Sequence, residues 1–342
     1  MRVIRGLPSA LERRDCAVAI GNFDGVHRGH QALLAEVCQA ARVRSLTPAV
    51  ITFEPHPKEF FGATHLTRIS TLRDKVTRIL ACGIERVYVL PFDAATARLT
   101  PAEFARSILA EGLNCRWVTV GENFRFGFEN CGDVATLTEL GRHYGFETFI
   151  TPMLFHGTER ISSSRIRAAL ALGDIDEASR MLGRPLSMTG RVVHGAALGR
   201  NLGFPTLNLF TLPPGSHAEP AVKGVFAVRV KGLDPLGGRY PGVASLGCKP
   251  TVSTEKRWLL ETNVFNWAGD AYGRLIEVEF VEKLRDEKKF SGLDELKAQI
   301  ARDSERAKAI FGFRNYRCSR TIETAPATDH LNKAGSFSTM QT

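Results

Sequence analysis

The sequence predicts two domains of different class: an α/β domain with a doubly wound parallel sheet, then an antiparallel β-barrel with a C-terminal helix packed on it. In the first half, short apolar runs alternate with segments whose apolar residues recur at helical spacing, which is typical of a parallel sheet with helices on both faces. In the second half, β-branched runs are separated by glycines and prolines. The length of 342 residues also favours two hydrophobic cores over one.

Composition narrows the class of protein. Hydrophobic residues at 44% and charged residues at 24% are typical of a soluble globular chain. No signal-peptide pattern follows Met1 and no apolar run could cross a bilayer, so we expect a cytoplasmic protein. The seven cysteines form no Cys-x-x-Cys pair, which argues against a disulfide framework or a zinc cluster. The net charge of +9 suits an anionic partner, either nucleic acid or a phosphate-rich small molecule, and does not choose between them.

The first strand is expected over 17–20, where the run is continuously apolar, as in a strand buried on both faces. Gly21 then lets the backbone turn tightly, and a helix is expected over 31–43. His27 and His30 therefore lie near a helix start, where backbone N–H groups and the helix dipole favour a phosphate. Both imidazoles share one helical face and can donate to the same anion. Taken alone, such a pair is more often a surface or capping feature, and no cysteine or acidic partner stands at a spacing suited to zinc.

The stretch from Gly21 to His30, Gly-Asn-Phe-Asp-Gly-Val-His-Arg-Gly-His, resembles the His-x-Gly-His signature of nucleotidyltransferases. The form is the one found in bacterial bifunctional riboflavin kinase/FAD synthetases. This resemblance implies a Rossmann-like nucleotidyltransferase domain in which His27 and His30 stabilise charge on the phosphates of ATP. The other residues of the stretch expected to contact the nucleotide are Gly21, Phe23, Asp24 and Gly29.

The rest of the first domain alternates between strands and helices. In one of the helices, Thr100 suits the N-cap and Pro101 the first helical position. Ligands on parallel sheets bind beyond the carboxyl ends of the strands, so the stretches after the strands, including Asn123, are expected on one edge. Strands are expected over 48–53, 86–90, 116–120 and 146–151, and helices over 71–82, 101–111, 133–144 and 174–182.

The stretch 160–167 places serines at a helix start and arginines in its first turns. From the residues alone, a clamp for pyrophosphate and an ordinary serine N-cap with solvated arginines are equally good interpretations. The segment 161–165 resembles the Ile-Ser-Ser-(Ser/Thr)-Arg element of the same family, which binds the nucleotide. The resemblance implies that Ser163, Ser164 and Arg165, together with Asn123, bind ATP or the leaving pyrophosphate.

The pattern changes at about residue 185, so we expect domains over 1–185 and 186–312 and a disordered tail over 313–342. Several strands separated by turns predict an antiparallel barrel. These strands are expected over 187–193, 224–230, 240–246, 258–265 and 274–283. The final helix, over 292–309, carries an apolar stripe expected to pack on the outside of the barrel, formed by Leu293, Leu296, Ile300 and Ala307.

The stretch 190–208 is rich in glycine, which by itself more often means a flexible turn than a ligand loop, and it is not a Walker A loop. It resembles the riboflavin kinase signature, in which a Pro-Thr-x-Asn element binds Mg²⁺ and ATP phosphates. Thr206 and Asn208 match that element, and a hydroxyl and an amide oxygen are reasonable magnesium ligands. The resemblance also implies that Gly199 contacts the nucleotide.

Glu261 lies on a predicted strand, where a lone glutamate is usually only solvated. By resemblance to the kinase family it is the general base on the terminal ribityl hydroxyl of the flavin. Asn263, often histidine in relatives, and Arg285 are expected near the flavin; Asn266 is often aspartate in relatives.

The resemblance implies a bifunctional enzyme that phosphorylates riboflavin with ATP to give FMN and then adenylylates FMN to FAD, releasing pyrophosphate. Both steps need Mg²⁺, and the partners are small molecules, with no nucleic acid and no membrane. Two rival hypotheses are a nucleotidyltransferase that makes another dinucleotide cofactor, disfavoured by the motifs of the second domain, and a nucleic-acid-binding barrel. With three Trp and five Tyr the chain offers few stacking platforms for nucleic acid.

Overall fold

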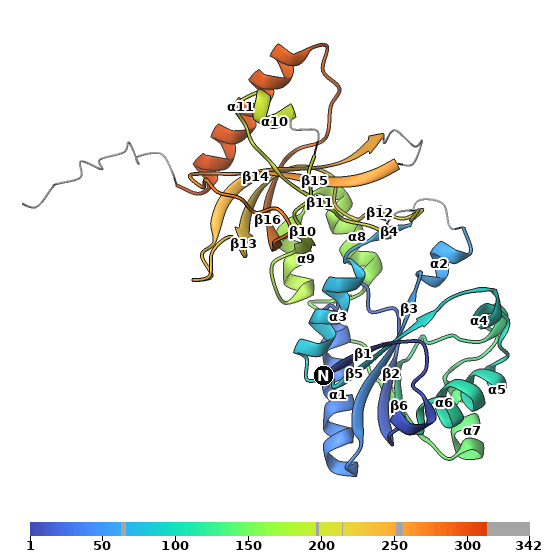
Figure 1. Cartoon of the computed structure of the whole chain (residues 1–342). Helices are drawn as coiled ribbons and strands as arrows, with labels where there is room; N and C mark the ends of the chain where they lie inside the picture. Colours follow the sequence, from blue (N-terminus) through green and yellow to red (C-terminus); the bar gives the residue numbers. More distant parts are fainter. Residues whose placement is uncertain (63–65, 196–197, 214, 251–255, 313–342) are drawn as a thin grey trace, which may run out of the picture.

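A computed structural model describes residues 1–62, 66–195, 198–213, 215–250 and 256–312 (Figure 1). The first domain contains a six-stranded sheet of order β1-β5-β3-β2-β6-β7, with every neighbouring pair parallel. The predicted parallel sheet is confirmed. Its strands are β1 (Arg2–Arg5), β2 (Cys16–Ile20), β3 (Thr47–Glu54), β5 (Arg86–Pro91), β6 (Cys115–Gly121) and β7 (Glu147–Thr151).

Helices cover both faces of this sheet, because alternate strand residues belong to two separate cores. Ala17 and Ala19 of β2 pack with α1 (Arg28–Arg44) and α3 (Leu72–Ala81). Val18 and Ile20 pack on the opposite side with the helix over 101–113 and with α7 (Val134–Tyr144). The helix over 101–113 is built from α5 (Pro101–Glu103), the π-helical η2 (Phe104–Ala110) and α6 (Glu111–Leu113).

The second domain is the predicted antiparallel barrel, formed by a six-stranded sheet of order β10-β16-β13-β14-β15-β11. A single bridge between Val193 and Asn208 links the two outer strands, so the barrel is nearly closed. Phe226 and Phe280 fill its interior. The strands are β10 (Ser187–Arg191), β11 (Leu207–Phe210), β13 (Gly224–Lys231), β14 (Tyr240–Pro250), β15 (Lys256–Val264) and β16 (Leu275–Arg285).

The last helix, α11 (Leu293–Ile310), packs on the outside of the barrel as expected. Ala307 is buried against Val225 and Val243, which face away from the barrel interior. One member of the expected apolar stripe is wrong: Leu293 is 59% exposed, because it lies at the first position of the helix, before the helix meets the sheet. Leu296 and Ile300 line a cavity between α11 and the barrel.

Two helices, α8 (Ser163–Leu172) and α9 (Ile175–Leu182), lie between the sheets and join the domains (Figure 1). Their buried side chains belong to the same core cluster as the barrel interior. A two-residue parallel pair, β4 (Thr67–Arg68) with β12 (Glu219–Pro220), makes a second connection. The boundary at 185 stays a prediction, and the tail over 313–342 lies outside the described residues.

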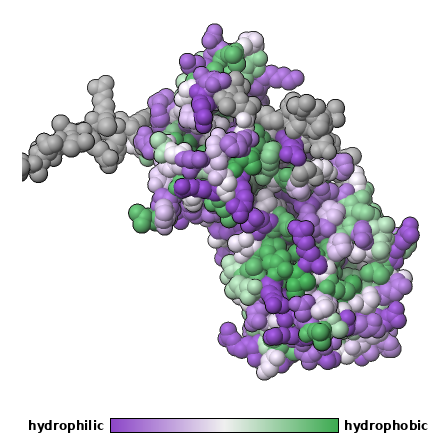
Figure 2. Space-filling model, in the orientation of Figure 1, coloured by the Kyte–Doolittle hydropathy of each residue, from purple (hydrophilic) through white to green (hydrophobic). Residues whose placement is uncertain are grey.

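The remaining elements are short. They are η1 (Ala10–Glu12), α2 (Pro57–Phe60), α4 (Ala94–Arg98), η3 (Phe128–Asn130), β8 (Phe155–His156), β9 (Glu159–Arg160) and α10 (Leu198–Asn201). Figure 2 shows a mostly hydrophilic surface, with hydrophobic residues gathered on the visible face of the first domain below the barrel. Across the described ranges, no helix is both long enough and apolar enough to span a membrane.

Candidate active sites

The loop between β2 and α1 contains predicted nucleotide-binding residues, and part of its backbone adopts an unfavourable conformation. Phe23 and Val26 have positive φ angles of 50° and 44°, in the left-handed region that β-branched and bulky residues rarely adopt. Gly29 leaves room for an imidazole, since a Cβ there would lie 3.2 Å from the ring of His27. Gly21, directly after β2, begins this turn. The His27 ring can therefore lie directly against the backbone of the first turn of α1.

The two predicted histidines are stacked at the start of α1. Their ring centroids lie 3.6 Å apart at an interplanar angle of 18°, and the ring of Phe23 lies 5.1 Å from that of His30. His27 is the N-cap residue, and its Nδ1 accepts the backbone N–H of His30 at 3.3 Å. A neutral His27 must therefore carry its proton on Nε2, which leaves that N–H to donate to a ligand.

Both imidazoles are neutral at physiological pH. Burial lowers the pKa of His27 to about 4, against the opposing influence of Asp24, and burial together with His27 lowers the pKa of His30 well below its usual value. Nδ1 of His30 is buried without a hydrogen-bond partner. The pair thus offers N–H donors without a permanent positive charge of its own.

Asp24, predicted to contact the nucleotide, is buried and bonded within the protein. Its carboxylate accepts the backbone N–H groups of Ile69 and Ser70, each at 3.1 Å, and the hydroxyl of Ser70 at 3.2 Å. It also pairs with the guanidinium of Arg167 on α8 at 2.6 Å. These contacts fix the histidine loop against α8, and a direct contact of Asp24 with a nucleotide stays a prediction.

The start of α8 is brought beside the histidine loop. Ser162 is its N-cap, and the hydroxyl of Ser163 donates to the backbone carbonyl of Asp24 at 2.9 Å. Arg165 is held by two carboxylates, those of Glu159 and Glu177, each at 2.8 Å. The other two predicted nucleotide residues of this domain, Ser164 and Asn123, are exposed.

Four phenylalanines gather near the carboxyl ends of β3 and β5, on the edge where ligands of parallel sheets bind. Phe92 lies 5.7 Å from Phe53, 5.6 Å from Phe60 and 5.7 Å from Phe61, measured between ring centroids with edge-on geometry. Phe61 is 66% exposed. The cluster therefore presents an aromatic surface at the ligand edge of the sheet.

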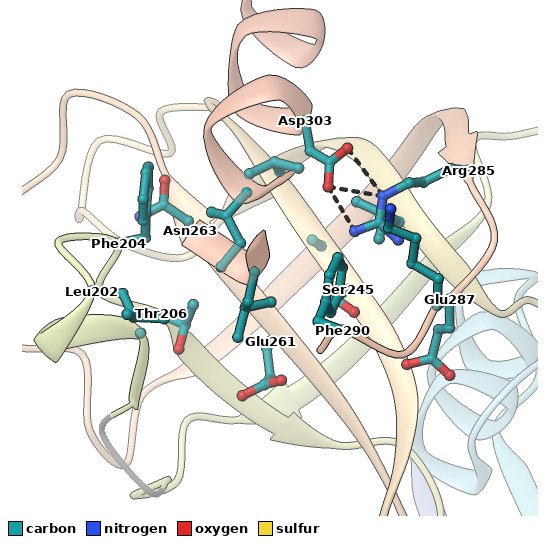
Figure 3. A pocket seen from close by; sticks show the side chains of 17 residues that line it. Leu202, Phe204, Thr206, Ser245, Glu261, Asn263, Arg285, Glu287, Phe290 and Asp303 are labelled. Atoms are coloured by element: carbon teal, nitrogen blue, oxygen red, sulfur yellow. Dashed lines mark hydrogen bonds and ion pairs between the residues drawn. The ribbon is translucent and has the colours of Figure 1, made fainter. Parts of the chain in front are cut away.

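The predicted kinase residues converge on the outer face of the barrel (Figure 3). Asn208 on β11 is the cross-strand partner of Glu261 on β15, so both side chains project from one face. The hydroxyl of Thr206 lies 3.4 Å from Oδ1 of Asn208. A Cβ at Gly199 would lie 2.5 Å from the carbonyl of Phe204, so this position requires glycine.

A cavity of about 300 Å³ opens between this face and α11. Glu261, Asn263 and Arg285 line it together with Thr206, and its apolar walls include Phe204, Phe290 and Leu296. In Figure 3 the Arg285 guanidinium is joined to the carboxylate of Asp303 on α11, with Nη2 to Oδ2 at 2.7 Å. The cavity therefore combines apolar walls with several charged and polar side chains, as a small-molecule site can.

Another cavity, of about 260 Å³, is also lined by Thr206. It is lined by Arg200, Asp270 and Tyr272, and the ring of Tyr272 stacks on His194 at 3.8 Å between centroids. Thr206 therefore lines both cavities.

Comparisons with known proteins match both domains. The family model for FAD synthetase matches residues 9–165, and that for riboflavin kinase matches residues 182–311. A bifunctional riboflavin kinase/FMN adenylyltransferase from Escherichia coli (strain K12) is 42% identical over 317 residues, covering 91% of this chain and 98% of the relative. The chain belongs to the bifunctional riboflavin kinase/FMN adenylyltransferase family. A relative of the same description from Haemophilus influenzae is 38% identical over 313 residues, with coverage of 91% and 99%.

A solved structure shares the fold of this family member over both domains. It is a crystal structure described as a macrolide-efflux protein from Streptococcus pneumoniae, with 30% identity and a TM-score of 0.70, covering 90% of this chain and 99% of that one. The predicted nucleotidyltransferase-like and kinase-like domains are thus confirmed by fold as well as by family.

Two positions at which this family member departs from the expected pattern are compatible with the structure. Asn266 has a positive φ of 52°, which asparagine and aspartate adopt more readily than other residues with a side chain. The amide of Asn263 donates to the carbonyl of Pro205 at 2.8 Å, a bond that an imidazole N–H could also make. Their roles toward the flavin stay predictions.

Several residues at these sites were not predicted. They are Arg167, Arg184 and Asp303, which contact site residues distant in sequence, and the aromatic cluster of Phe53, Phe60, Phe61 and Phe92. The aromatic cluster had a signal in the sequence, because its members follow two predicted strands at the ligand edge. Arg167 lies in the stretch 160–167, whose arginines were noted, but its partner Asp24 had no signal there. Arg184 and Asp303 had no signal, because helical and strand periodicity does not identify a polar partner.

Proposed function

We propose that this chain makes FAD in two steps at two separate sites. The barrel domain transfers the γ-phosphate of ATP to riboflavin, and the α/β domain joins the resulting FMN to the AMP part of a second ATP. The observation that carries the proposal is the presence of two sites, each within the range that one family model matches: the stacked histidines within 9–165 and the cavity around Glu261 within 182–311.

At the kinase site, the cavity of about 300 Å³ suits riboflavin because it combines apolar walls with polar groups and has Glu261 on its wall. The other cavity that Thr206 lines then takes ATP. Glu261 accepts the proton of the terminal ribityl hydroxyl, whose oxygen attacks the γ-phosphorus while the bond to the β-phosphate oxygen breaks, so ADP leaves. Arg285, paired with Asp303, lies near the flavin.

Magnesium fits the residues beside this cavity. The hydroxyl of Thr206 and the amide oxygen of Asn208 would hold it, since both are oxygen donors and lie 3.4 Å apart. Among the described residues, no group of three or more His, Cys, Asp or Glu could hold a metal ion, so the remaining ligands would come from ATP phosphates and water. The bound ion would neutralise phosphate charge during transfer.

At the adenylylation site, the FMN phosphate attacks the α-phosphorus of ATP, and the bond to the β-phosphate breaks to release pyrophosphate. No side-chain nucleophile is needed. His27 and His30 donate N–H groups to the ATP phosphates, with the start of α8 beside them, where Ser163, Ser164 and Arg165 bind the nucleotide with Asn123. The aromatic cluster at the same sheet edge supports stacking of the flavin ring.

The setting proposed for this activity is the cytoplasm, with small molecules as the only partners. Cysteines that are described in the structure are free thiols, which suits a reducing compartment.

The test is incubation of the purified chain with riboflavin, ATP and Mg²⁺, with FMN and FAD separated by chromatography. Both products are expected, and chelation of Mg²⁺ should stop both steps. His30→Ala should still form FMN from riboflavin and fail to convert supplied FMN to FAD. Glu261→Ala should do the reverse. Proportional loss of both activities in either variant would contradict two separate sites.

A further inference from the structure

Arg184 lies in the short linker between α9 and β10, yet its guanidinium reaches back to the histidine loop. It donates to the backbone carbonyls of Gly25 and Val26, with Nη1 3.1 Å from the Val26 oxygen. It also donates to the carbonyl of Leu182 at the end of α9, at 3.0 Å. One side chain from the domain junction thus joins the last helix of the first domain to the loop that follows β2.

The charge of Arg184 is directed at backbone oxygens. Among the ion pairs of the described residues, none within 4.0 Å involves Arg184, and its nearby carboxylates, Asp74 and Glu277, are paired with Arg78 and Lys231. Its Nε is buried without a hydrogen-bond partner. Arg184 is half-buried, and a cation that is partly removed from water is costly unless its hydrogen bonds are satisfied. An arginine with only carbonyl acceptors is therefore best explained by the backbone geometry that it fixes.

That backbone is strained. Val26 is β-branched and has a φ of 44°, and the adjacent Gly25 has a φ of 83°. Two of the three carbonyls that Arg184 binds, those of Val26 and Leu182, also accept the side-chain amide N–H of Gln31 on α1, each at 2.9 Å. The side chains of Arg184 and Gln31 thus both bond to the turn at Val26. An unfavourable φ such as that of Val26 persists only where the surrounding contacts enforce it.

The turn directly precedes His27, which caps α1 and stacks on His30. We propose that Arg184 is a positioning residue for adenylyl transfer: it holds the Gly25–Val26 turn so that both imidazoles keep their orientation toward the ATP phosphates. This inference rests on the proposed role of the histidines. Because Arg184 lies in the linker that leads into the barrel, this linker would also help to hold the adenylylation site in place.

The test compares Arg184→Ala and Arg184→Lys with the wild type, using FMN plus ATP for adenylylation and riboflavin plus ATP for the kinase step. Displacing catalytic groups by about 1 Å costs on the order of 10²-fold in rate. We therefore expect kcat for adenylylation to fall about 10- to 100-fold in both variants, with KM for ATP changed less than about threefold. Kinase activity should stay within about twofold, because Arg184 touches no residue of that site.

Lysine separates geometry from charge, because it keeps the positive charge and lacks the fork that spans two carbonyls. Full recovery of adenylylation in Arg184→Lys would overturn the positioning role in favour of a purely electrostatic one. Equal loss of both activities, with a lowered Tm, would show a structural role only. Arg42→Ala, at an exposed arginine on α1, is the matched control for loss of a positive charge and should leave both activities unchanged.

Hydrogen exchange gives a readout besides activity. Amides of residues 23–30 should exchange faster in Arg184→Ala, whereas amides of the barrel strands should not change. If the wild type forms FAD and His30→Ala does not, while both Arg184 variants keep full kcat and unchanged exchange, only the inference about Arg184 fails. If the wild type itself forms no FAD, the proposed function fails.

Discussion

Replacing Asp303 should release Arg285 from the wall of the kinase cavity. The Asp303 carboxylate accepts Nε of Arg285 at 3.1 and 3.0 Å and Nη2 at 2.7 Å, and its side chain is 8% exposed. Removing one partner of a buried ion pair costs about 3–5 kcal/mol. Because the Arg285 side chain is 22% exposed and regains some hydration, we expect Asp303→Ala to lower the free energy of unfolding by about 2–4 kcal/mol.

The same variant should raise KM for riboflavin by about tenfold, since a charged group that moves by one ångström or more no longer matches its ligand. Urea denaturation and steady-state kinase assays measure the two effects. The double variant Asp303→Leu/Arg285→Met separates them, because apolar residues can replace a buried pair without loss of stability, so it should regain stability and keep the high KM. If Asp303→Ala loses less than about 0.5 kcal/mol and keeps its KM, the pair does not hold Arg285 in place.

Three further predictions concern the other groups of the two sites. The His27 pKa is about 4 in the folded protein and 6.5 for an ordinary histidine, so the unfolded chain binds more protons than the folded one between these two pH values. The contribution of His27 to stability is therefore fully present above pH 6.5 and is lost as pH drops toward 4. Tm should fall over this range, and it should fall less steeply in His27→Gln. Phe61→Ala should raise KM for FMN in adenylylation by about 2- to 10-fold and leave Tm and the kinase step unchanged, which kinetics with each substrate would show. Asn208→Ala should increase the Mg²⁺ concentration needed for a half-maximal kinase rate, and it should leave unchanged the Mg²⁺ concentration needed for half-maximal adenylylation of supplied FMN. An equal shift in both concentrations would argue against a magnesium ligand in the barrel.

Helices and strands that are determined by neighbouring residues in the chain could be predicted from the sequence. Thr100 was expected to cap a helix with Pro101 at its first position, and Thr100 forms a full capping box with Glu103. β1 was not predicted, because Arg-Val-Ile-Arg is short and mostly exposed at the sheet edge and shows no clear alternation. β11 was not predicted, because it begins inside the glycine-rich stretch that was interpreted as a ligand loop.

The candidate sites divide in the same way. His27 and His30, or Thr206 and Asn208, are close in sequence, so a motif contains their spacing. Arg184 and Gly25 are 159 positions apart, and only the contacts of α8 and α9 with the histidine loop and α1 bring them together. Sequence patterns therefore miss the side chains that hold a site in place. The periodicity of apolar residues predicts which positions are buried, but it does not predict which polar residue will bond to which.

The packing of α8 and α9 also bears on whether the two activities can be separated. Ile166, Leu170 and Met181 of these helices share one core cluster with Phe226 and Phe280 of the barrel. A cut at residue 185 would expose both halves of that cluster to water, at about 25 cal/mol for each Å² of apolar surface. It would also part β10 from α3, since Arg78 donates to the carbonyl of Ser187 at 2.9 Å. Although the family models divide the chain into two parts, one core joins the barrel to α8, the helix that begins beside the histidine loop.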